Sequence, residues 1–142
     1  MPESVMITRL LLACLFGGAI GYLREIERKT AGLRTHILVC LGSALIMVLS
    51  LYICVEYKSS DAGRIAAGVI TGIGFLGAGA IIREPGSVKG LTTAASIWVT
   101  SAIGLVVGSG YYFAATTATV LTLIVIYFLR TVEQVFLKKE GD

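Results

Sequence analysis

The stretch from Gly90 to Leu129, about 40 residues long, contains no charged side chain, and it constrains the fold more than any other feature of the sequence. A transmembrane helix needs about 20 mostly apolar residues, so the stretch can cross a bilayer twice but is too long for one crossing. Gly108-Ser109-Gly110 lies near its middle, where glycine favours a tight turn. The stretch therefore predicts a helical hairpin with spans over residues 92–107 and 111–129.

Three further apolar runs precede the hairpin, over residues 5–23, 37–55 and 65–82. Charged residues make up 15% of the chain, against about 25% in a soluble domain, and the mean hydropathy is +0.85. A water-soluble fold of 142 residues cannot hide this much apolar surface, whereas a bilayer acts as the apolar solvent. The sequence therefore predicts one all-α domain over residues 1–142, a polytopic helical membrane protein with five transmembrane helices.

Five crossings place the two termini on opposite sides of the membrane, and the basic residues indicate which side is which. Short loops rich in Lys and Arg stay in the cytoplasm. With the N-terminus outside, only Arg9, Lys58 and Arg64 of the 12 Lys and Arg residues lie outside. We therefore predict an outer N-terminus and a cytoplasmic C-terminus. The basic residues on the cytoplasmic side are then Arg24, Arg28, Lys29, Arg34, Arg83, Lys89, Arg130, Lys138 and Lys139.

Two segments of the chain resemble each other. GAIGYLRE at residues 18–25 is similar to GAIIRE at residues 79–84, and Gly-Leu-x-Thr follows each of them, at 32–35 and 90–93. Each copy is a span, an Arg-Glu pair at its cytoplasmic end, a polar loop, and Gly-Leu-x-Thr opening the next span. We predict a parallel two-span repeat, related by a pseudo-twofold axis along the membrane normal, plus one extra helix. Chance similarity between glycine-rich helices is the alternative.

Small residues recur along the predicted spans, including three GxxxG pairs. Lipid tails give no hydrophobic drive between helices, so close backbone contact through small residues matters in a bilayer. The pattern is compatible with packing within one protomer, with a helix interface in a homodimer, or with a weakened helix that unwinds around a ligand. The glycines expected to serve helix packing are Gly17, Gly21, Gly68, Gly72, Gly74, Gly77, Gly79, Gly104 and Gly108.

Polar groups gather at the predicted inner boundary of the membrane. Arg24 and Arg28 are four residues apart, as are Glu25 and Lys29, so each pair is expected to share a helix face. The cluster either anchors the spans or forms a cytoplasm-facing pocket for a ligand or partner, since an unpaired charge near lipid is costly. The candidate binding residues are Arg24, Glu25, Arg28, Arg34, Thr35, His36, Arg83, Glu84, Thr92 and Thr93.

Metal and cofactor chemistry has little support in the sequence. His36 is the only histidine and has no second His or Cys at ligand spacing, so it is better explained as an interfacial hydrogen-bonding residue than as a metal ligand. The three cysteines lie in apolar runs and are expected to be buried thiols. Glu25 and Glu84 are the candidate Mg²⁺ ligands, and no other cofactor is expected. The sequence has no basic patch interleaved with aromatic residues, so it gives no indication of nucleic-acid binding.

Four segments in this order resemble the MgtC/SapB family of bacterial inner-membrane proteins. The segments are GYLREIERK at 21–29, AGLRTH at 31–36, GIGFLGAGAII at 72–82, and VKGLTTAA at 88–95 followed by Trp98. The resemblance implies a multi-pass fold in the bacterial plasma membrane and a link to growth in scarce Mg²⁺. It also implies a regulator that acts on other membrane proteins, such as the F-type ATP synthase or transporters. The chain ends soon after Leu129, and in this it resembles the short SapB-like members, which lack a C-terminal cytoplasmic domain.

Three function classes compete on this sequence. A non-enzymatic regulator acting through helix contacts is favoured by the small-residue faces. A transporter or channel for Mg²⁺ or another cation is the alternative, although no Asp or Glu lies in the middle of any predicted span, and oxygen ligands are what Mg²⁺ prefers. An enzyme is disfavoured, because His36 and Cys40, four residues apart, are the one nucleophile–base pair available.

Overall fold

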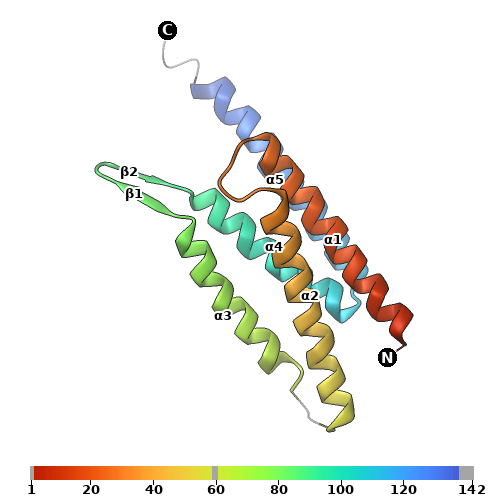
Figure 1. The fold of residues 1–142 in the computed structure, drawn as a ribbon. Coiled ribbons are helices and arrows are strands. Elements are labelled where there is room, and N and C mark those ends of the chain that lie inside the picture. The colour runs from red at the N-terminus through yellow and green to blue at the C-terminus, as the bar shows by residue number, and fades with distance from the viewer. Residues whose placement is uncertain (1, 59–60, 138–142) are drawn as a thin grey trace.

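The computed structural model describes residues 2–58 and 61–137, with side chains described as far as residue 128. Five helices run back and forth along one axis, and a short antiparallel hairpin separates the third from the fourth (Figure 1). The elements are α1 (Glu3–Ile26), α2 (Leu33–Glu56), α3 (Gly63–Gly79), β1 (Ile82–Glu84), β2 (Ser87–Lys89), α4 (Leu91–Ser109) and α5 (Tyr112–Leu137).

The apolar composition of the helices identifies the chain as a membrane protein. Three of them, α1, α2 and α4, are long and apolar enough to cross a bilayer. The other two are also apolar, but their described apolar segments are shorter. These segments are Gly63–Gly79 of α3, with 17 residues, and Tyr112–Phe128 of α5. The five predicted spans therefore each correspond to a helix, whereas the number of crossings stays a prediction.

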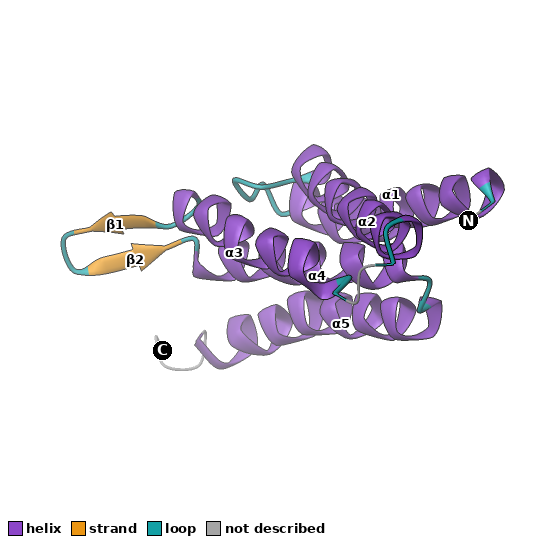
Figure 2. Ribbon diagram, turned by 90° about the horizontal axis from the view of Figure 1, so that it is seen from below, coloured by secondary structure: helices purple, strands orange, loops and turns teal. Residues whose placement is uncertain are grey.

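Helix α4 is the hub of the bundle, because it contacts each of the other four helices. It lies between the α1–α2 pair and α5 (Figure 2). The core between these helices is built from small and branched residues such as Ala13, Ile20, Ala44, Ile103 and Val107, which are almost completely buried. Such residues let helix backbones approach closely in lipid.

Four glycines set the closest helix contacts. A Cβ atom on Gly17 would lie 2.6 Å from the carbonyl oxygen of His36, and one on Gly21 would lie 2.8 Å from the Cα atom of Leu33. Gly104 and Gly108 approach α2 in the same way, at the backbones of Cys40 and Ala44. The backbones of α1 and α4 therefore pack directly on α2 within one protomer.

The segment after α3 differs from the predicted span over 65–82. The helix ends at Gly79, and Ile82 begins strand β1, which pairs with β2 in the register Ile82↔Lys89 and Glu84↔Ser87. The tight connection uses Pro85 and Gly86, and Gly86 has a φ of +81°. Proline followed by a glycine of positive φ is typical of a type II turn. The hairpin is exposed along both strands.

The start of α1 and the end of α5 lie at opposite ends of the bundle (Figure 1). The α1–α2 loop and the hairpin share one end, and the start of α1 and the end of α2 lie at the other. This is the arrangement expected of an odd number of crossings, but the orientation in the membrane stays a prediction. Lys138 and Lys139, which contribute to the predicted cytoplasmic charge, lie outside the described residues, as does the side chain of Arg130.

The predicted repeat stays a prediction, and its two Arg-Glu pairs differ in structure. Arg24 and Glu25 lie on the last turn of helix α1, whereas Arg83 and Glu84 lie on strand β1. Gly-Leu-x-Thr does open the next helix in both copies, because α2 begins at Leu33 and α4 at Leu91.

Candidate functional site

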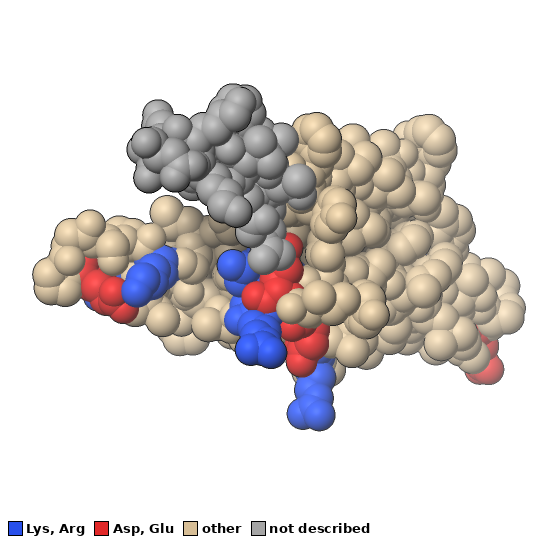
Figure 3. Space-filling model, turned by 90° about the horizontal axis from the view of Figure 1, so that it is seen from above, with Lys and Arg blue, Asp and Glu red and all other residues tan. Residues whose placement is uncertain are grey.

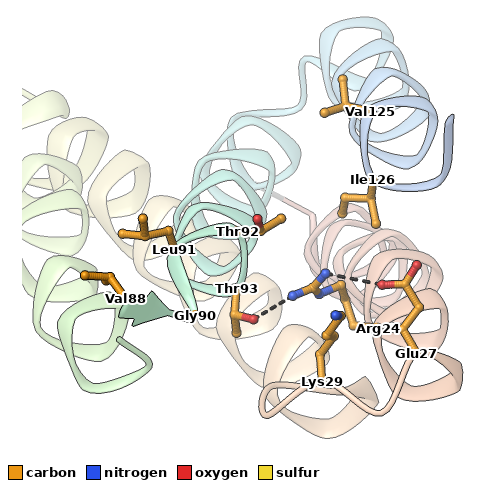
Figure 4. Close-up of a pocket in the computed structure, with 10 residues that line it drawn as sticks. All are labelled: Arg24, Glu27, Lys29, Val88, Gly90, Leu91, Thr92, Thr93, Val125 and Ile126. Atoms are coloured by element: carbon orange, nitrogen blue, oxygen red, sulfur yellow. Dashed lines mark hydrogen bonds and ion pairs between the residues drawn. The ribbon is translucent and has the colours of Figure 1, made fainter. Parts of the chain in front are cut away.

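A buried arginine joins α1 to the start of α4. Arg24 is only 2% exposed, and its Nη2 donates a 2.6 Å hydrogen bond to Oγ1 of Thr93. Its Nη1 lies 3.4 Å from Oε2 of Glu27, whose side chain is also 2% exposed (Figure 4). A buried charge is tolerated when it is paired and hydrogen-bonded, so Glu27 and Thr93 together explain why this guanidinium can lie inside the bundle.

One helical turn deeper, His36 links α2 to α4. Its Nδ1 lies 2.8 Å from the carbonyl oxygen of Gly32, and its Nε2 lies 3.1 Å from Oγ of Ser96. A carbonyl oxygen only accepts hydrogen bonds, so we assign the ring proton to Nδ1. Ser96 also lies 2.8 Å from the carbonyl oxygen of Thr93. Its single hydroxyl proton can serve either that oxygen or His36.

A third pair continues the same interface. Oγ of Ser43 on α2 lies 2.9 Å from Oγ of Ser101 on α4, and both residues are buried. Arg24–Thr93, His36–Ser96 and Ser43–Ser101 form what we call the polar ladder, which runs along α4 away from the hairpin. Its members satisfy one another inside the protein, as polar groups at membrane depth must.

A cavity of about 550 Å³ opens beside the first rung of the ladder. Figure 4 shows the Arg24 guanidinium and the Lys29 ammonium directed toward it, with Thr92 and Thr93 on one side and α5 on the other. The lining residues are Arg24, Glu27, Lys29, Val88, Gly90, Leu91, Thr92, Thr93, Val125 and Ile126. We call this space the polar cavity.

Charged side chains gather at the same end of the bundle. Figure 3 views this end and shows basic and acidic side chains side by side, while most of the remaining surface in view carries neither charge. The hairpin contributes a pair of its own, with Nζ of Lys89 2.7 Å from Oε2 of Glu84. The polar cavity therefore lies where apolar helices give way to a charged surface.

The structure brings only some of the predicted site residues together. Arg24, His36 and Thr93 belong to the polar ladder, and Thr92 lines the polar cavity. The remaining predicted residues lie apart from this network, at exposed or partly exposed positions. They are Glu25, Arg28, Arg34, Thr35, Arg83 and Glu84.

The expected helix-face pairs at the end of α1 do not form. Helix α1 ends at Ile26, and Arg28 has a φ of +53°, so Arg28 and Lys29 lie in the loop and not on the helix face of Arg24 and Glu25. Glu25 instead reaches the next helix, where its Oε2 accepts a 2.9 Å hydrogen bond from the amide of Leu33. The loop thereby brings a carboxylate to the N-terminus of α2, where the helix dipole favours negative charge.

Sequence reasoning missed the serines of the polar ladder. Thr93, Ser96 and Thr100 are three and four residues apart, so they lie on one face of α4, and all three are buried. A polar stripe of this spacing in an otherwise apolar span is the signal that identifies the buried face. Glu27, the partner of Arg24, is visible in the sequence three residues further on.

The predicted Mg²⁺ ligands have other partners. Glu25 accepts from the Leu33 amide, and Glu84 pairs with Lys89. Within the described part of the chain, no three His, Cys, Asp or Glu side chains are grouped closely enough to hold a metal ion.

Helix α3 presents a second feature, an open glycine face. Added Cβ atoms on Gly68, Gly72, Gly74 and Gly79 would meet no described atom within 4 Å, beyond the helix itself. Gly77, in contrast, faces α4, where its Cβ would lie 3.7 Å from that of Ala94. Gly68, Gly72 and Gly79 follow one another at spacings of four and seven residues, so they share one side of the helix, and we call the surface that they form the α3 glycine face.

Comparisons with known proteins place the chain in one group. The family model described as the MgtC family matches residues 10–135. The chain is 49% identical over 125 residues to Escherichia coli (strain K12) "Putative magnesium transporter YhiD", covering 84% of this chain and 58% of that protein. It is 42% identical to protein MgtC of Brucella abortus (strain 2308), covering 87% of this chain and 50% of that protein.

A further relative has the same name as the family. Protein MgtC of Salmonella typhimurium (strain LT2) is 41% identical over 128 residues, which cover 90% of this chain and 54% of that protein. The chain thus spans only 50 to 58% of the length of these three relatives. No solved structure matches it significantly.

Proposed function

The chain belongs to the MgtC family, and we propose on this premise that it is a non-enzymatic regulator of other membrane proteins in the bacterial plasma membrane, linked to Mg²⁺ homeostasis. Its partners in this role are a helix of a regulated protein, such as an ATP synthase or a transporter, and a second copy of the chain in a homodimer.

The observation that carries the proposal is the α3 glycine face. Gly68 and Gly72 leave the helix backbone bare over one turn, and Gly79 leaves it bare again at the end of the helix, with no described atom packed on any of the three. In lipid, a bare backbone stripe is valuable because a second helix can approach it closely and gain van der Waals contact. Phe75 is 83% exposed and lies between Gly72 and Gly79 on the same side of the helix, where it adds apolar contact area for a partner.

Transport of Mg²⁺ or another cation is the second candidate function, and the name of the relative YhiD favours it. Mg²⁺ loses its water reluctantly and is bound through carboxylates. Glu25, Glu27 and Glu84 lie at the charged end of the bundle, and each already engages an amide or a cation of this chain. Transport would therefore require these carboxylates to exchange partners, which makes regulation the better supported function.

The regulatory proposal is tested by filling the α3 glycine face. Tagged protein is cross-linked in native membranes and purified. We expect Gly72→Leu to lower the amount of partner protein that co-purifies at least several-fold. Gly42→Leu is the matched control, because Gly42 is an exposed helical glycine on α2 whose Cβ would also meet nothing within 4 Å. Two differently tagged copies show whether the lost partner is the chain itself or another protein.

Recovery unchanged by Gly72→Leu would remove the support for regulation through this face. Transport is examined separately, with purified protein in liposomes that contain a Mg²⁺-sensitive dye. Mg²⁺ entry that exceeds entry into empty liposomes, and that Glu25→Gln or Glu84→Gln abolishes, would replace regulation by transport as the function.

A further inference from the structure

The two helices that open with Gly-Leu-x-Thr differ in how their first turns are capped. The carboxylate of Glu25 accepts the hydrogen bond of the Leu33 amide and so caps α2. The N-cap residue of α4 is Gly90, which has no side chain to cap the helix that begins at Leu91. The first amides of a helix have no acceptor within the helix and need one from elsewhere.

The predicted repeat indicates which residue to compare with Glu25 at the start of α4. Glu84 is the counterpart of Glu25 in that repeat, but it lies on strand β1 and pairs with Lys89 at 2.7 Å. Glu84 therefore stays on the hairpin and does not reach the first turn of α4, as Glu25 reaches the first turn of α2. An anion from outside the chain would complete the first turn of α4 as Glu25 completes that of α2.

The polar cavity lies at this uncapped turn and has the charge that an anion requires. Its lining contains two cations, Arg24 and Lys29, and one carboxylate, Glu27. Arg24 pairs with Glu27 and donates to Thr93, and Lys29 is the second cation of the described lining. The positive end of the α4 dipole adds to this positive charge. Thr92 and Thr93, whose hydroxyl groups can donate to an oxyanion, complete the lining.

An apolar groove of about 240 Å³ adjoins the polar cavity. It runs between α4 and α5, and the two spaces share Thr92, Val125 and Ile126 in their linings. Its lining is Thr92, Ala95, Ser96, Val99, Leu121, Thr122, Val125 and Ile126. A ligand with a negative head and an apolar tail matches both spaces, whereas a free anion matches only the first.

We propose that the polar cavity binds the phosphate headgroup of an anionic phospholipid, with one acyl chain in the groove between α4 and α5. Basic pockets between transmembrane helices are suited to such headgroups at the membrane surface. The phosphate oxygens accept from the first amides of α4 and from the ammonium group of Lys29. The site does not depend on whether the chain regulates another protein or transports a cation.

The test compares lipids bound to the full chain by native mass spectrometry. Purified protein is delipidated in detergent and titrated with dioleoyl phosphatidylglycerol or dioleoyl phosphatidylcholine. We expect phosphatidylglycerol to be retained several-fold more than phosphatidylcholine. Lys29→Gln should remove most of this preference, and Lys58→Gln should not. Lys58 is a matched control, because it is also an exposed lysine just beyond a helix end.

A second variant separates a lipid from a free anion. Ala95→Phe adds a ring in the groove from an exposed position on α4, so it should lower phosphatidylglycerol retention while the melting temperature stays within a few degrees of the wild type. Equal retention of the two lipids, or equal effects of Lys29→Gln and Lys58→Gln, would overturn the proposal. Inorganic phosphate that displaces phosphatidylglycerol, with no effect of Ala95→Phe, would show a free-anion site instead of a lipid site.

Discussion

At the scale of single residues, glycine has two opposite roles in this chain. Gly104 lies against the α2 backbone, where a Cβ would overlap the carbonyl of Cys40 and lie 2.8 Å from the Cβ of Ser43. Gly72 has no described neighbour within 4 Å of such an atom. Both are helical glycines in apolar surroundings, so composition alone does not distinguish them.

Alanine substitution separates these roles. We expect Gly104→Ala to destabilise the folded protein by about 1–3 kcal/mol, because α2 and α4 must move apart to admit the methyl group. Gly72→Ala should leave stability unchanged or raise it by up to about 1 kcal/mol, since alanine favours a helix and nothing opposes the methyl group. Thermal unfolding of the two variants in detergent measures the difference. Equal losses of stability would contradict the helix contacts described for α4.

The candidate site was predictable in its residue types but not in its pairings. A charged arginine, a lone histidine and a threonine at a membrane boundary are conspicuous, so Arg24, His36 and Thr93 were identified from the sequence alone. Ser96 was missed, because serine is unremarkable in a small-residue helix until its spacing from Thr93 is considered. Which hydroxyl group meets which ring nitrogen depends on the approach of α2 to α4, and no local pattern encodes that approach.

At the scale of elements, the connection from α4 to α5 depends on a distant arginine. Arg9 on α1 donates a 2.7 Å hydrogen bond from Nη1 to the carbonyl oxygen of Gly108, on the last turn of α4. Its guanidinium also lies close to Gly110, which has a φ of +87°. The positive charge lies where the helix dipole is negative, and it satisfies a carbonyl group at the helix end.

We expect Arg9→Met to loosen this connection. The variant keeps an unbranched apolar stem but loses the donor, so the Gly108 carbonyl group loses a partner at a cost of about 1–3 kcal/mol. Hydrogen exchange should become faster at the amides of Gly110 and Tyr111, which bond to the last turn of α4. Thr8→Val is the control, since exposed Thr8 bonds only within its own helix. Unchanged exchange in Arg9→Met would show that the glycine turn holds without the arginine.

The helices themselves were largely predictable, and the hairpin was not. Long apolar runs located all five helices, because a helix in a bilayer needs apolar residues on the sides that face lipid. The predicted third span ran on to Ile82, whereas the helix ends at Gly79. The similarity to residues 18–25 placed Arg83 and Glu84 at a helix end, whereas Pro85 and Gly86, which directly follow them, favour a tight turn. The same turn explains why the two copies cap their next helices differently.

At the scale of the whole molecule, polarity is arranged along the bundle axis. Buried hydroxyl and imidazole groups join α2 to α4 inside, and apolar side chains such as Leu38, Val55 and Phe113 cover the outside. Charged groups gather at the end that carries the polar cavity (Figure 3). A bilayer fits this pattern, because it surrounds the apolar flanks while both ends stay in water or among headgroups.

The orientation of this bundle, and the crossing of α3 in particular, can be measured with single cysteines. Helix α3 is the shortest of the five, and its 17 residues extend about 26 Å at 1.5 Å per residue. The native cysteines are first replaced by alanine or serine, and cysteine is then placed at Lys58, before α3, or at Ser87, after it. Both positions are exposed.

We expect a membrane-impermeant maleimide to label position 58 in intact spheroplasts and position 87 only after permeabilisation. The reason is the charge distribution: the Lys and Arg residues of the α1–α2 loop and the hairpin hold that end in the cytoplasm. Labelling of both positions from the same side would show that α3 does not cross. Labelling of position 87 alone in intact spheroplasts would show that the protein has the opposite orientation. The polar cavity would then face the outer leaflet and its lipids.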